Sequence, residues 1–341
     1  FLGNLFEYYL ENLDKKIAIL GATSGDTGSA AIEAFRGKKD IKVFILHPLN
    51  KVSEVQRRQM TTVTDSNIYN IALDGTFDDC QKIVKNLFLD QEIKRKISLT
   101  AINSINWARI MAQSVYFFWA YLQLDNKKIN FIVPSGNFGN IYSARVSKHM
   151  GLPIDKLHIV TNQNDILHRI ISRGQMQINE VKQTFSPSMD IQVSSNFERQ
   201  LFETLNNDSS KVTEIMNLFF KKGSYSFNNS TVLALQKIYQ SESVSNEQTL
   251  STIKLFKEKY NYISDPHTAT ALQSLNLKKT ADPIVSLACA HPAKFGDVIQ
   301  KAIGTKPILP LEINKIFDKE EKMIILPNKV EEIKSLILKK V

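Results

Sequence analysis

A glycine-containing loop between a short apolar run and an amphipathic segment limits most strongly what this chain can fold into. The loop, Ser135 to Asn140 (SGNFGN), follows the apolar run 131–133 and Pro134. Such a run, closed by proline and glycine, predicts a strand that ends in a tight loop, and Gly139 then opens a helix. The N–H groups of a helix's first turn lack partners and carry partial positive charge, so a phosphate fits there. The pattern predicts an anion site, although such loops also serve as plain turns.

A second loop follows the apolar run 17–20 and begins at Gly21. It is neither a phosphate-binding loop with lysine after its second glycine nor the glycine pattern of dinucleotide folds. Hydroxyls and backbone donors dominate it, which suits a carboxylate, and a helix cap with no further role is the alternative. Asp26 or Thr27 is the expected cap of a helix that ends at Gly37. The loop residues are Thr23, Ser24, Gly25, Asp26 and Thr27.

Strand-like runs alternate with helix-like segments near the start of the chain. The runs are residues 17–20, 43–46 and 68–73, and the helical segments are 52–60 and 77–89. This alternation predicts an α/β fold with mostly parallel sheets covered by helices. We expect two domains: a smaller βαβ domain at 17–100, and a larger one formed by 1–16 and 101–341. Helical stripes predict a helical insertion on the larger domain at about 196–262.

A third motif, residues 103–109 (NSINWAR), introduces a long helix. Asn103 or Ser104 is an ordinary N-cap for it, and that structural role is one alternative. Arg109 lies about one turn further on and offers a fork of donors to a phosphate. The expected apolar stripe of this helix is Ala108, Met111, Val115, Phe118, Trp119 and Leu122.

Composition excludes several classes of function. The 341 residues are 43% hydrophobic and 23% charged, which is typical of a globular protein, and no apolar run is long enough to cross a membrane. The formal charge is +9, but the lysines are scattered at the ends of elements, so we expect neither a nucleic-acid nor a membrane partner. No histidine spacing suggests a metal site. Two distant cysteines, Cys80 and Cys289, favour a reducing, cytoplasmic location.

Five motifs occur together and in a fixed order. With this set, the chain resembles the threonine synthase family, enzymes that depend on pyridoxal 5′-phosphate and share the fold group of the tryptophan synthase β subunit. The resemblance covers essentially the whole chain and implies a fold-type II pyridoxal-phosphate enzyme. The motifs are GATSGDTG at 21–28, NSINWAR at 103–109, VPSGNFGN at 133–140, DPHTA at 265–269 and AHPAKF at 290–295.

The resemblance also implies roles for individual residues. It places the cofactor's phosphate on the loop after Pro134 and its pyridine nitrogen at Cys289, where the family usually has threonine. It places the substrate's carboxylate on Thr23 to Thr27. It assigns to the third motif the binding of the substrate's phosphate and the orientation of the cofactor ring. The implied cofactor residues are Gly136, Asn137, Phe138, Gly139, Asn140 and Cys289, and those of the third motif are Asn103, Ser104, Asn106 and Arg109.

One family feature has no counterpart in the sequence. The FKDF segment, whose lysine forms the Schiff base with the cofactor, is absent, and the chain begins at Phe1. We therefore expect an N-terminally truncated chain without that catalytic lysine and without turnover of its own. The implied activity is conversion of O-phospho-L-homoserine and water to L-threonine and phosphate, the last step of threonine biosynthesis. Alternatives are a non-catalytic anion-binding or cofactor-binding remnant, and a serine or threonine dehydratase. The oligomeric state stays open.

Overall fold

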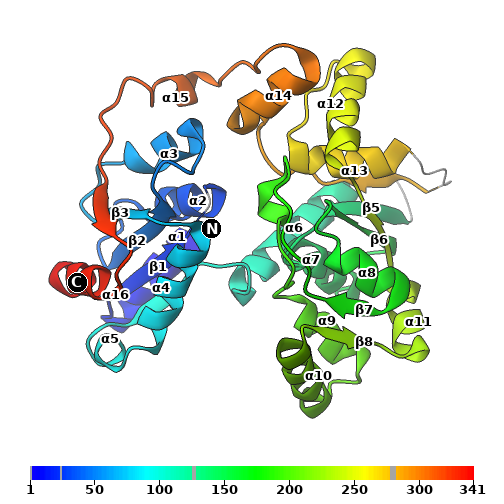
Figure 1. Ribbon diagram of the computed structural model, residues 1–341, viewed down its shortest axis with the longest axis horizontal. Coiled ribbons are helices and arrows are strands. Elements are labelled where there is room, and N and C mark those ends of the chain that lie inside the picture. The colour runs from blue at the N-terminus through cyan, green and yellow to red at the C-terminus, as the bar shows by residue number, and fades with distance from the viewer. Residues whose placement is uncertain (1, 24, 125–127, 277–281) are drawn as a thin grey trace. The chain divides into compact units, whose positions relative to one another are not determined.

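The computed structural model describes residues 2–23, 25–124, 128–276 and 282–341, and the chain divides into two compact units (Figure 1). The first unit is Phe1–Asn106 with Ile308–Val341, and the second is Trp107–Pro307. Each unit has its own parallel sheet with helices packed on it. The predicted α/β class with mostly parallel sheets is confirmed.

The sheet of the first unit has the strand order β11-β3-β2-β1-β4 within the described residues, and all neighbouring strands are parallel. Its middle strands are almost fully buried, as expected for a sheet covered on both faces. The strands are β1 (Ile17–Ala22), β2 (Ile41–Pro48), β3 (Ile68–Asp74), β4 (Leu99–Ala101) and β11 (Ile324–Pro327).

The helices of the first unit cover both faces of this sheet. One group packs around Ile32, Phe35 and Met60, and the other packs around Cys80, Leu87 and Ile337. The helices are α1 (Leu2–Leu13), α2 (Asp26–Phe35), α3 (Glu54–Thr61), α4 (Phe77–Leu89), α5 (Gln91–Lys96), α15 (Leu311–Asn314) and α16 (Val330–Lys340).

The bounds of this unit differ from the expected domain at 17–100 because both chain ends belong to it. Helix α1 packs on α2, with the rings of Phe6 and Phe35 5.7 Å apart. Strand β11 continues the sheet beside β3, and α16 packs on α4, which Figure 1 shows with the C-terminus in red. Arg57 on α3 also holds the C-terminal segment through Glu321, at 2.8 Å. Pairing between strands distant in sequence is not visible in a local pattern.

The sheet of the second unit has the order β10-β5-β6-β9, again parallel throughout the described residues. A separate antiparallel pair, β7 and β8, lies beside it. The strands are β5 (Ile129–Pro134), β6 (Ile154–Thr161), β7 (Gln175–Gln177), β8 (Ser224–Ser226), β9 (Tyr239–Ser243) and β10 (Ile284–Ser286).

The helices of this unit surround the sheet. The α-helices are α6 (Trp107–Leu122), α7 (Gly139–His149), α8 (Ile166–Arg173), α9 (Phe197–Thr204), α10 (Ser209–Lys222), α11 (Asn229–Ile238), α12 (Asn246–Tyr260), α13 (Pro266–Asn276) and α14 (Gly296–Ile303), and the short 3₁₀ helices are η1 (Pro187–Met189) and η2 (Pro292–Phe295). The helix expected to open at Gly139 is therefore confirmed.

Two expectations about this unit were wrong. The segment 196–262 is not a purely helical insertion, because β9 within it pairs with β6 in the main sheet. The buried side of α6 is Ile110, Ser114 and Phe117, whereas Met111 and Trp119 of the expected stripe are 44% and 66% exposed. Aromatic and aliphatic residues occupy most of this helix, so its sequence does not distinguish one face from the other.

Candidate active site

The SGNFGN loop leaves the carboxyl end of β5 and turns directly into α7. Ser135 still belongs to the sheet, because its N–H donates to the Val160 carbonyl at 2.8 Å. Phe138 is the N-cap of α7 and has a left-handed backbone, with φ 61° and ψ 7°. A non-glycine residue in this region costs about 1 kcal/mol or more, so other contacts must hold it there.

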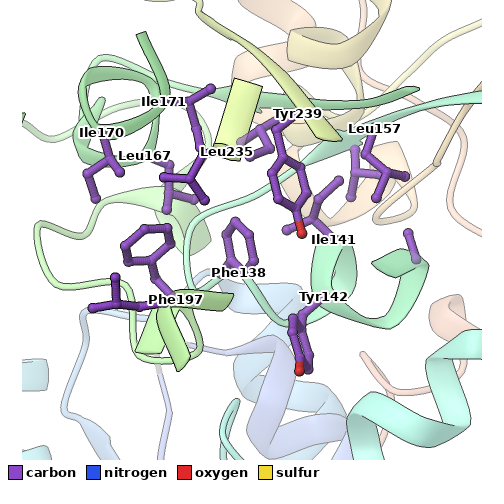
Figure 2. Close-up of a cluster of buried hydrophobic side chains, with 14 of the residues drawn as sticks. Phe138, Ile141, Tyr142, Leu157, Leu167, Ile170, Ile171, Phe197, Leu235 and Tyr239 are labelled. Atoms are coloured by element: carbon purple, nitrogen blue, oxygen red, sulfur yellow. The ribbon is translucent and has the colours of Figure 1, made fainter. Parts of the chain in front are cut away.

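Those contacts come from the core. Figure 2 shows the Phe138 ring among the buried side chains of neighbouring elements. It meets Phe197 edge to face at 5.6 Å and Tyr239 at 5.5 Å, and its side chain is fully buried. Burying a phenylalanine contributes about 2–3 kcal/mol, which offsets the backbone cost. Because its side chain belongs to the core, Phe138 has only backbone atoms to offer a cofactor.

The carbonyl groups of Gly136 and Asn137 are hydrogen-bonded to the segment before α9. The Ser194 hydroxyl donates to the Gly136 carbonyl at 2.8 Å. Asn196 donates to the Asn137 carbonyl twice, from its backbone N–H at 3.1 Å and from Nδ2 at 3.0 Å. These bonds fix the orientation of the peptide planes, so the N–H groups of the loop point the other way.

Five consecutive N–H groups, those of residues 136–140, donate to no other group among the described residues. Oδ1 of Asn140 is also buried without a partner there. A Cβ built at Gly136 would lie 3.1 Å from Met189 Cα, so this loop is closely backed by η1. Buried donors rarely remain unpaired, and a row of them at a helix N-terminus suits an anion. The loop therefore fits the phosphate of the expected cofactor.

The end of β10 lies beside this loop, because β10 pairs with β5 up to Ser286 and Ile132. The chain then runs through Cys289, whose side chain is exposed. Its N–H donates to the Thr268 hydroxyl oxygen at 2.8 Å, and the Ala290 N–H donates to Asp265 Oδ2 at 3.2 Å. The structure thus brings the expected phosphate loop and the expected pyridine-nitrogen position to the same edge of one sheet.

Asp265 is a buried carboxylate at the N-terminus of α13. Its Oδ1 accepts from the His267 N–H and from His267 Nδ1, both at 2.9 Å, so it caps the first turn of this helix. Burial alone would raise the pKa of Asp265, but the bonds from His267, Thr268 and Ala290 outweigh burial and hold that pKa below its usual value. Asp265 is therefore ionised and fully bonded at neutral pH.

Arg109 lies in the first turn of α6, and its side chain is partly buried. Burial lowers the pKa of this guanidinium, which still carries its charge at neutral pH. Among the described residues, no carboxylate forms an ion pair with it. A partly desolvated guanidinium without a counter-ion is suited to an anionic ligand.

The loop after β1 is held by one of its own hydroxyls. Thr23 is buried, and its Oγ1 accepts from the N–H groups of Gly25 and Gly28, both at 2.9 Å. The N-cap of α2 is Gly25 rather than Asp26 or Thr27, and Asp26 accepts from Gln56 at 3.0 Å. Ser24 lies outside the described residues. The hydroxyl of Thr23 has a structural role, and the binding role of this loop stays a prediction.

The third motif begins before its helix. Helix α6 starts at Trp107, so neither Asn103 nor Ser104 is its N-cap, and that expectation was wrong. Asn103 instead accepts from the Ile105 N–H at 3.2 Å in a local turn, a common use of asparagine. Asn103, Ser104 and Asn106 belong to the first unit and Arg109 to the second. Their binding roles stay predictions.

Sequence reasoning missed the residues that support the site. Ser188 lies in η1, and Ser194 and Asn196 lie just before α9. None of the three belongs to a motif, and only contacts across the fold reveal them. No three His, Cys, Asp or Glu residues in the described ranges are grouped so that they could hold a metal ion. Within the same ranges, no helix combines the length and apolar character that crossing a membrane requires.

Comparison with known proteins gives the class that this fold and site define. Residues 2–217 match the family model of pyridoxal-phosphate-dependent enzymes, and residues 268–337 match the model of the threonine synthase C-terminal region. More distant solved enzymes of the pyridoxal-phosphate class, at 12% and 14% identity with TM-scores of 0.57 and 0.58, share the fold alone. The chain is a pyridoxal-phosphate-dependent enzyme of fold type II.

The family within this class follows from closer relatives. Threonine synthase of Pseudomonas aeruginosa is 43% identical over 98% of this chain and 73% of its own length. That of Saccharomyces cerevisiae is 45% identical, over 95% and 70%. A crystal structure of pyridoxal-phosphate-bound threonine synthase from Brucella melitensis has a TM-score of 0.96 at 41% identity, over 99% of this chain and 74% of that one. The chain belongs to the threonine synthase family.

Proposed function

We propose that this chain serves the conversion of O-phospho-L-homoserine and water to L-threonine and phosphate. The observation that carries the proposal is the row of unpartnered N–H groups at 136–140, next to the end of β10 that bears Cys289. The row supplies the anion site that a phosphorylated cofactor requires. Family membership supplies the reaction class, a phosphate-eliminating lyase acting on a small molecule.

Bound pyridoxal phosphate supplies the sink for the electron pair that remains when a proton leaves the substrate carbon. The residues of the protein bind and orient the cofactor and the substrate. The N–H groups of 136–140 would hold the cofactor's phosphate, and Cys289 would lie at its pyridine nitrogen. Since a thiol is only a weak hydrogen-bond partner, it would leave that nitrogen unprotonated.

The substrate's two anionic groups have separate sites in this proposal. Arg109 receives the leaving phosphate, because its guanidinium forms no ion pair among the described residues and offers a fork of donors. For Asn103, Ser104 and Asn106 a role toward the substrate's phosphate rests on the family resemblance alone. The loop from Thr23 to Thr27 receives the α-carboxylate. Removing the proton from the substrate also requires a base, and no lysine of the printed sequence lies in a motif that gives it this role.

Cofactor affinity tests the site. We expect the chain to bind pyridoxal 5′-phosphate at least tenfold more tightly than pyridoxal, measured by equilibrium dialysis. Gly136→Ala should remove most of this difference, because its Cβ would press on the backbone of Met189 and shift the loop. Gly296→Ala is the matched control, since nothing lies closer than Lys306 Cδ at 4.0 Å. Equal affinity for the two compounds would refute the proposed phosphate site.

Substrate selectivity separates this function from its rivals. O-phospho-L-homoserine should change the absorbance of the cofactor-loaded protein, whereas L-serine should not. A response to serine with release of ammonia would favour a dehydratase, and no response to either would favour a non-catalytic remnant. For the printed residues we expect binding without turnover, and borohydride should leave no reduced cofactor attached to a lysine.

The location and partners are proposals of the same kind. The two cysteines, Cys80 buried and Cys289 exposed, support a reducing compartment, and we propose the cytoplasm. A small phosphorylated amino acid is the proposed partner.

A further inference from the structure

We propose that His267 is a positioning residue for the proposed cofactor site: with Asp265 it connects the turn behind Gly136 to the end of β10 at Cys289. The inference rests on the proposed function for its consequence, because it concerns the spacing between the phosphate end and the ring end of the same site. All the residues involved belong to the second unit.

The first step of the connection is a contact between two backbones. The ideal Cβ of Gly136 would lie 3.1 Å from Met189 Cα and 3.3 Å from the Ser188 carbonyl oxygen. The phosphate loop therefore rests on the backbone of η1, and the side chain of Ile191 lies beside this contact, with Cδ1 3.3 Å from the same Cβ position. A shift of η1 by a few tenths of an ångström moves the N–H groups of the loop.

The second step fixes η1 to a histidine. The backbone N–H of Ser188 points to His267 Nε2 at 3.3 Å. Because a backbone N–H can only donate, Nε2 must accept, and the ring proton must lie on Nδ1. That proton is donated to Asp265 Oδ1 at 2.9 Å, and a carboxylate can only accept. The two partners thus impose one neutral tautomer on His267, and the Phe295 ring packs against its face at 5.0 Å between centroids.

The third step reaches the end of β10 from the other oxygen of the carboxylate. Asp265 Oδ2 accepts from the Ala290 N–H at 3.2 Å and from the Thr268 hydroxyl. The same hydroxyl oxygen accepts from the Cys289 N–H at 2.8 Å. Asp265 and His267 are almost completely buried, so water does not compete for these bonds.

A continuous path therefore runs from Gly136 through Ser188, His267 and Asp265 to Cys289. Its two ends are the positions that the proposed function assigns to the phosphate and to the pyridine nitrogen. The pyridine ring is rigid and the linker to its phosphate is short, so the spacing of the two loops must suit the cofactor. The DPHTA motif supplies the carboxylate, the histidine and the hydroxyl that hold this spacing.

Two substitutions at His267 separate the positioning role from simple packing. His267→Asn keeps a donor near the place of Nδ1 and removes the acceptor for Ser188. His267→Gln keeps an acceptor near the place of Nε2, so it preserves the bond from Ser188 that holds η1 and loses only the donor to Asp265. His168→Asn is the control, because His168 bonds to Ser241 and to no residue of η1.

Hydrogen exchange of the chain without cofactor gives the decisive readout. In His267→Asn we expect about fivefold faster exchange at 184–192 and also at 133–140, while His267→Gln and the control stay near the wild-type rates. Thr268→Val removes the hydroxyl that binds the Cys289 N–H, and we expect faster exchange at 286–291. This variant also keeps the proposal testable if His267→Asn does not fold.

Cofactor affinity gives the second readout. His267→Asn should weaken pyridoxal 5′-phosphate about fivefold, and His267→Gln should restore it to within about twofold. The inference is overturned if His267→Asn folds and its exchange at 133–140 is unchanged. It is also overturned if the Asn and Gln variants have the same exchange rates and the same cofactor affinity. If His267→Asn speeds exchange at 184–192 and at 133–140 but the wild-type chain binds no cofactor, the inference stands and the proposed function is contradicted.

Discussion

The Phe138 ring lies edge-on to the Tyr239 ring, with their centroids 5.5 Å apart and their planes at 67°. This contact joins the N-cap of α7 to the first residue of β9, 101 positions later in the chain (239 − 138). The left-handed backbone that turns the loop's N–H groups outward is therefore held from the core. The anion site that we propose would therefore depend on a buried side chain that does not itself contact the ligand.

Phe138→Ala should lower the free energy of unfolding by about 3–5 kcal/mol, because it leaves a cavity among Phe197 and Tyr239. It should also weaken pyridoxal 5′-phosphate at least tenfold in the protein that stays folded. Urea unfolding and equilibrium dialysis measure the two effects. Phe220→Ala, at a ring that is 58% exposed, should change neither by much. If Phe138→Ala lowers stability but leaves the cofactor affinity unchanged, the core contact of Phe138 does not support the proposed binding site.

Arg109→Gln should weaken O-phospho-L-homoserine at least about tenfold, since a charge-assisted bond is worth about 1.5–3 kcal/mol. Pyridoxal 5′-phosphate should keep its affinity to within about threefold, because another loop holds it. Titration of the cofactor-loaded protein, followed by absorbance, measures the difference. The exposed Arg173→Gln is the control. An equal loss of affinity for both ligands would show that Arg109 supports the fold of the site and does not bind the substrate.

The two cysteines should differ sharply in reactivity. Burial raises the pKa of Cys80 to about 12, with a smaller contribution from Asp79, and the side chain is inaccessible. Cys289 is exposed. We expect one equivalent of rapid alkylation at about pH 8, located at Cys289 by mass spectrometry and slowed by pyridoxal 5′-phosphate. Labelling of Cys80 in the folded chain, or no protection by the cofactor, would contradict this assignment.

Stability should fall in acid partly through Glu203. Burial would raise the pKa of Glu203, but the Tyr142 hydroxyl at 2.7 Å, His149 and Arg145 outweigh burial and lower it below 4.5. A carboxyl whose pKa is lower in the folded state adds stability above its unfolded pKa and loses it as the pH falls through the folded one. Urea unfolding between about pH 6 and pH 3 should therefore show a steeper loss in the wild type than in Glu203→Gln.

The control for that measurement is Glu198→Gln, because Glu198 is exposed on the same helix. Its unfolding free energy should follow the wild-type pH profile. An identical profile for Glu203→Gln would mean that the cluster around Glu203 contributes nothing to the acid response.

The sequence was most informative where the signal is local. The strand before Pro134 and the helix at Gly139 follow from an apolar run, proline and glycine, and the structure confirms them. These elements carry the proposed cofactor site. Their order along the chain also gave the parallel sheets, because strands that alternate with helices require crossover connections.

What the sequence did not predict depends on contacts between distant segments. Because β11 pairs with β3, the C-terminal segment belongs to the first unit rather than to the larger domain that we expected. Because β9 pairs with β6, the segment 196–262 contains a strand of the main sheet as well as helices. The bond between Ser188 and His267 joins residues 79 positions apart, and only His267 lies in a motif. Local propensity does not predict such contacts, because they form only when the whole sheet assembles.

The central claim is that backbone N–H groups of the loop after β5 bind the cofactor's phosphate. Selective ¹⁵N-glycine labelling tests it most directly, because Gly136 and Gly139 lie in the loop while Gly223 and Gly304 end distant helices. Pyridoxal 5′-phosphate should shift the Gly136 and Gly139 amide signals strongly, pyridoxal should not, and Gly223 and Gly304 should stay in place. Unmoved Gly136 and Gly139 signals at saturating cofactor would contradict the claim.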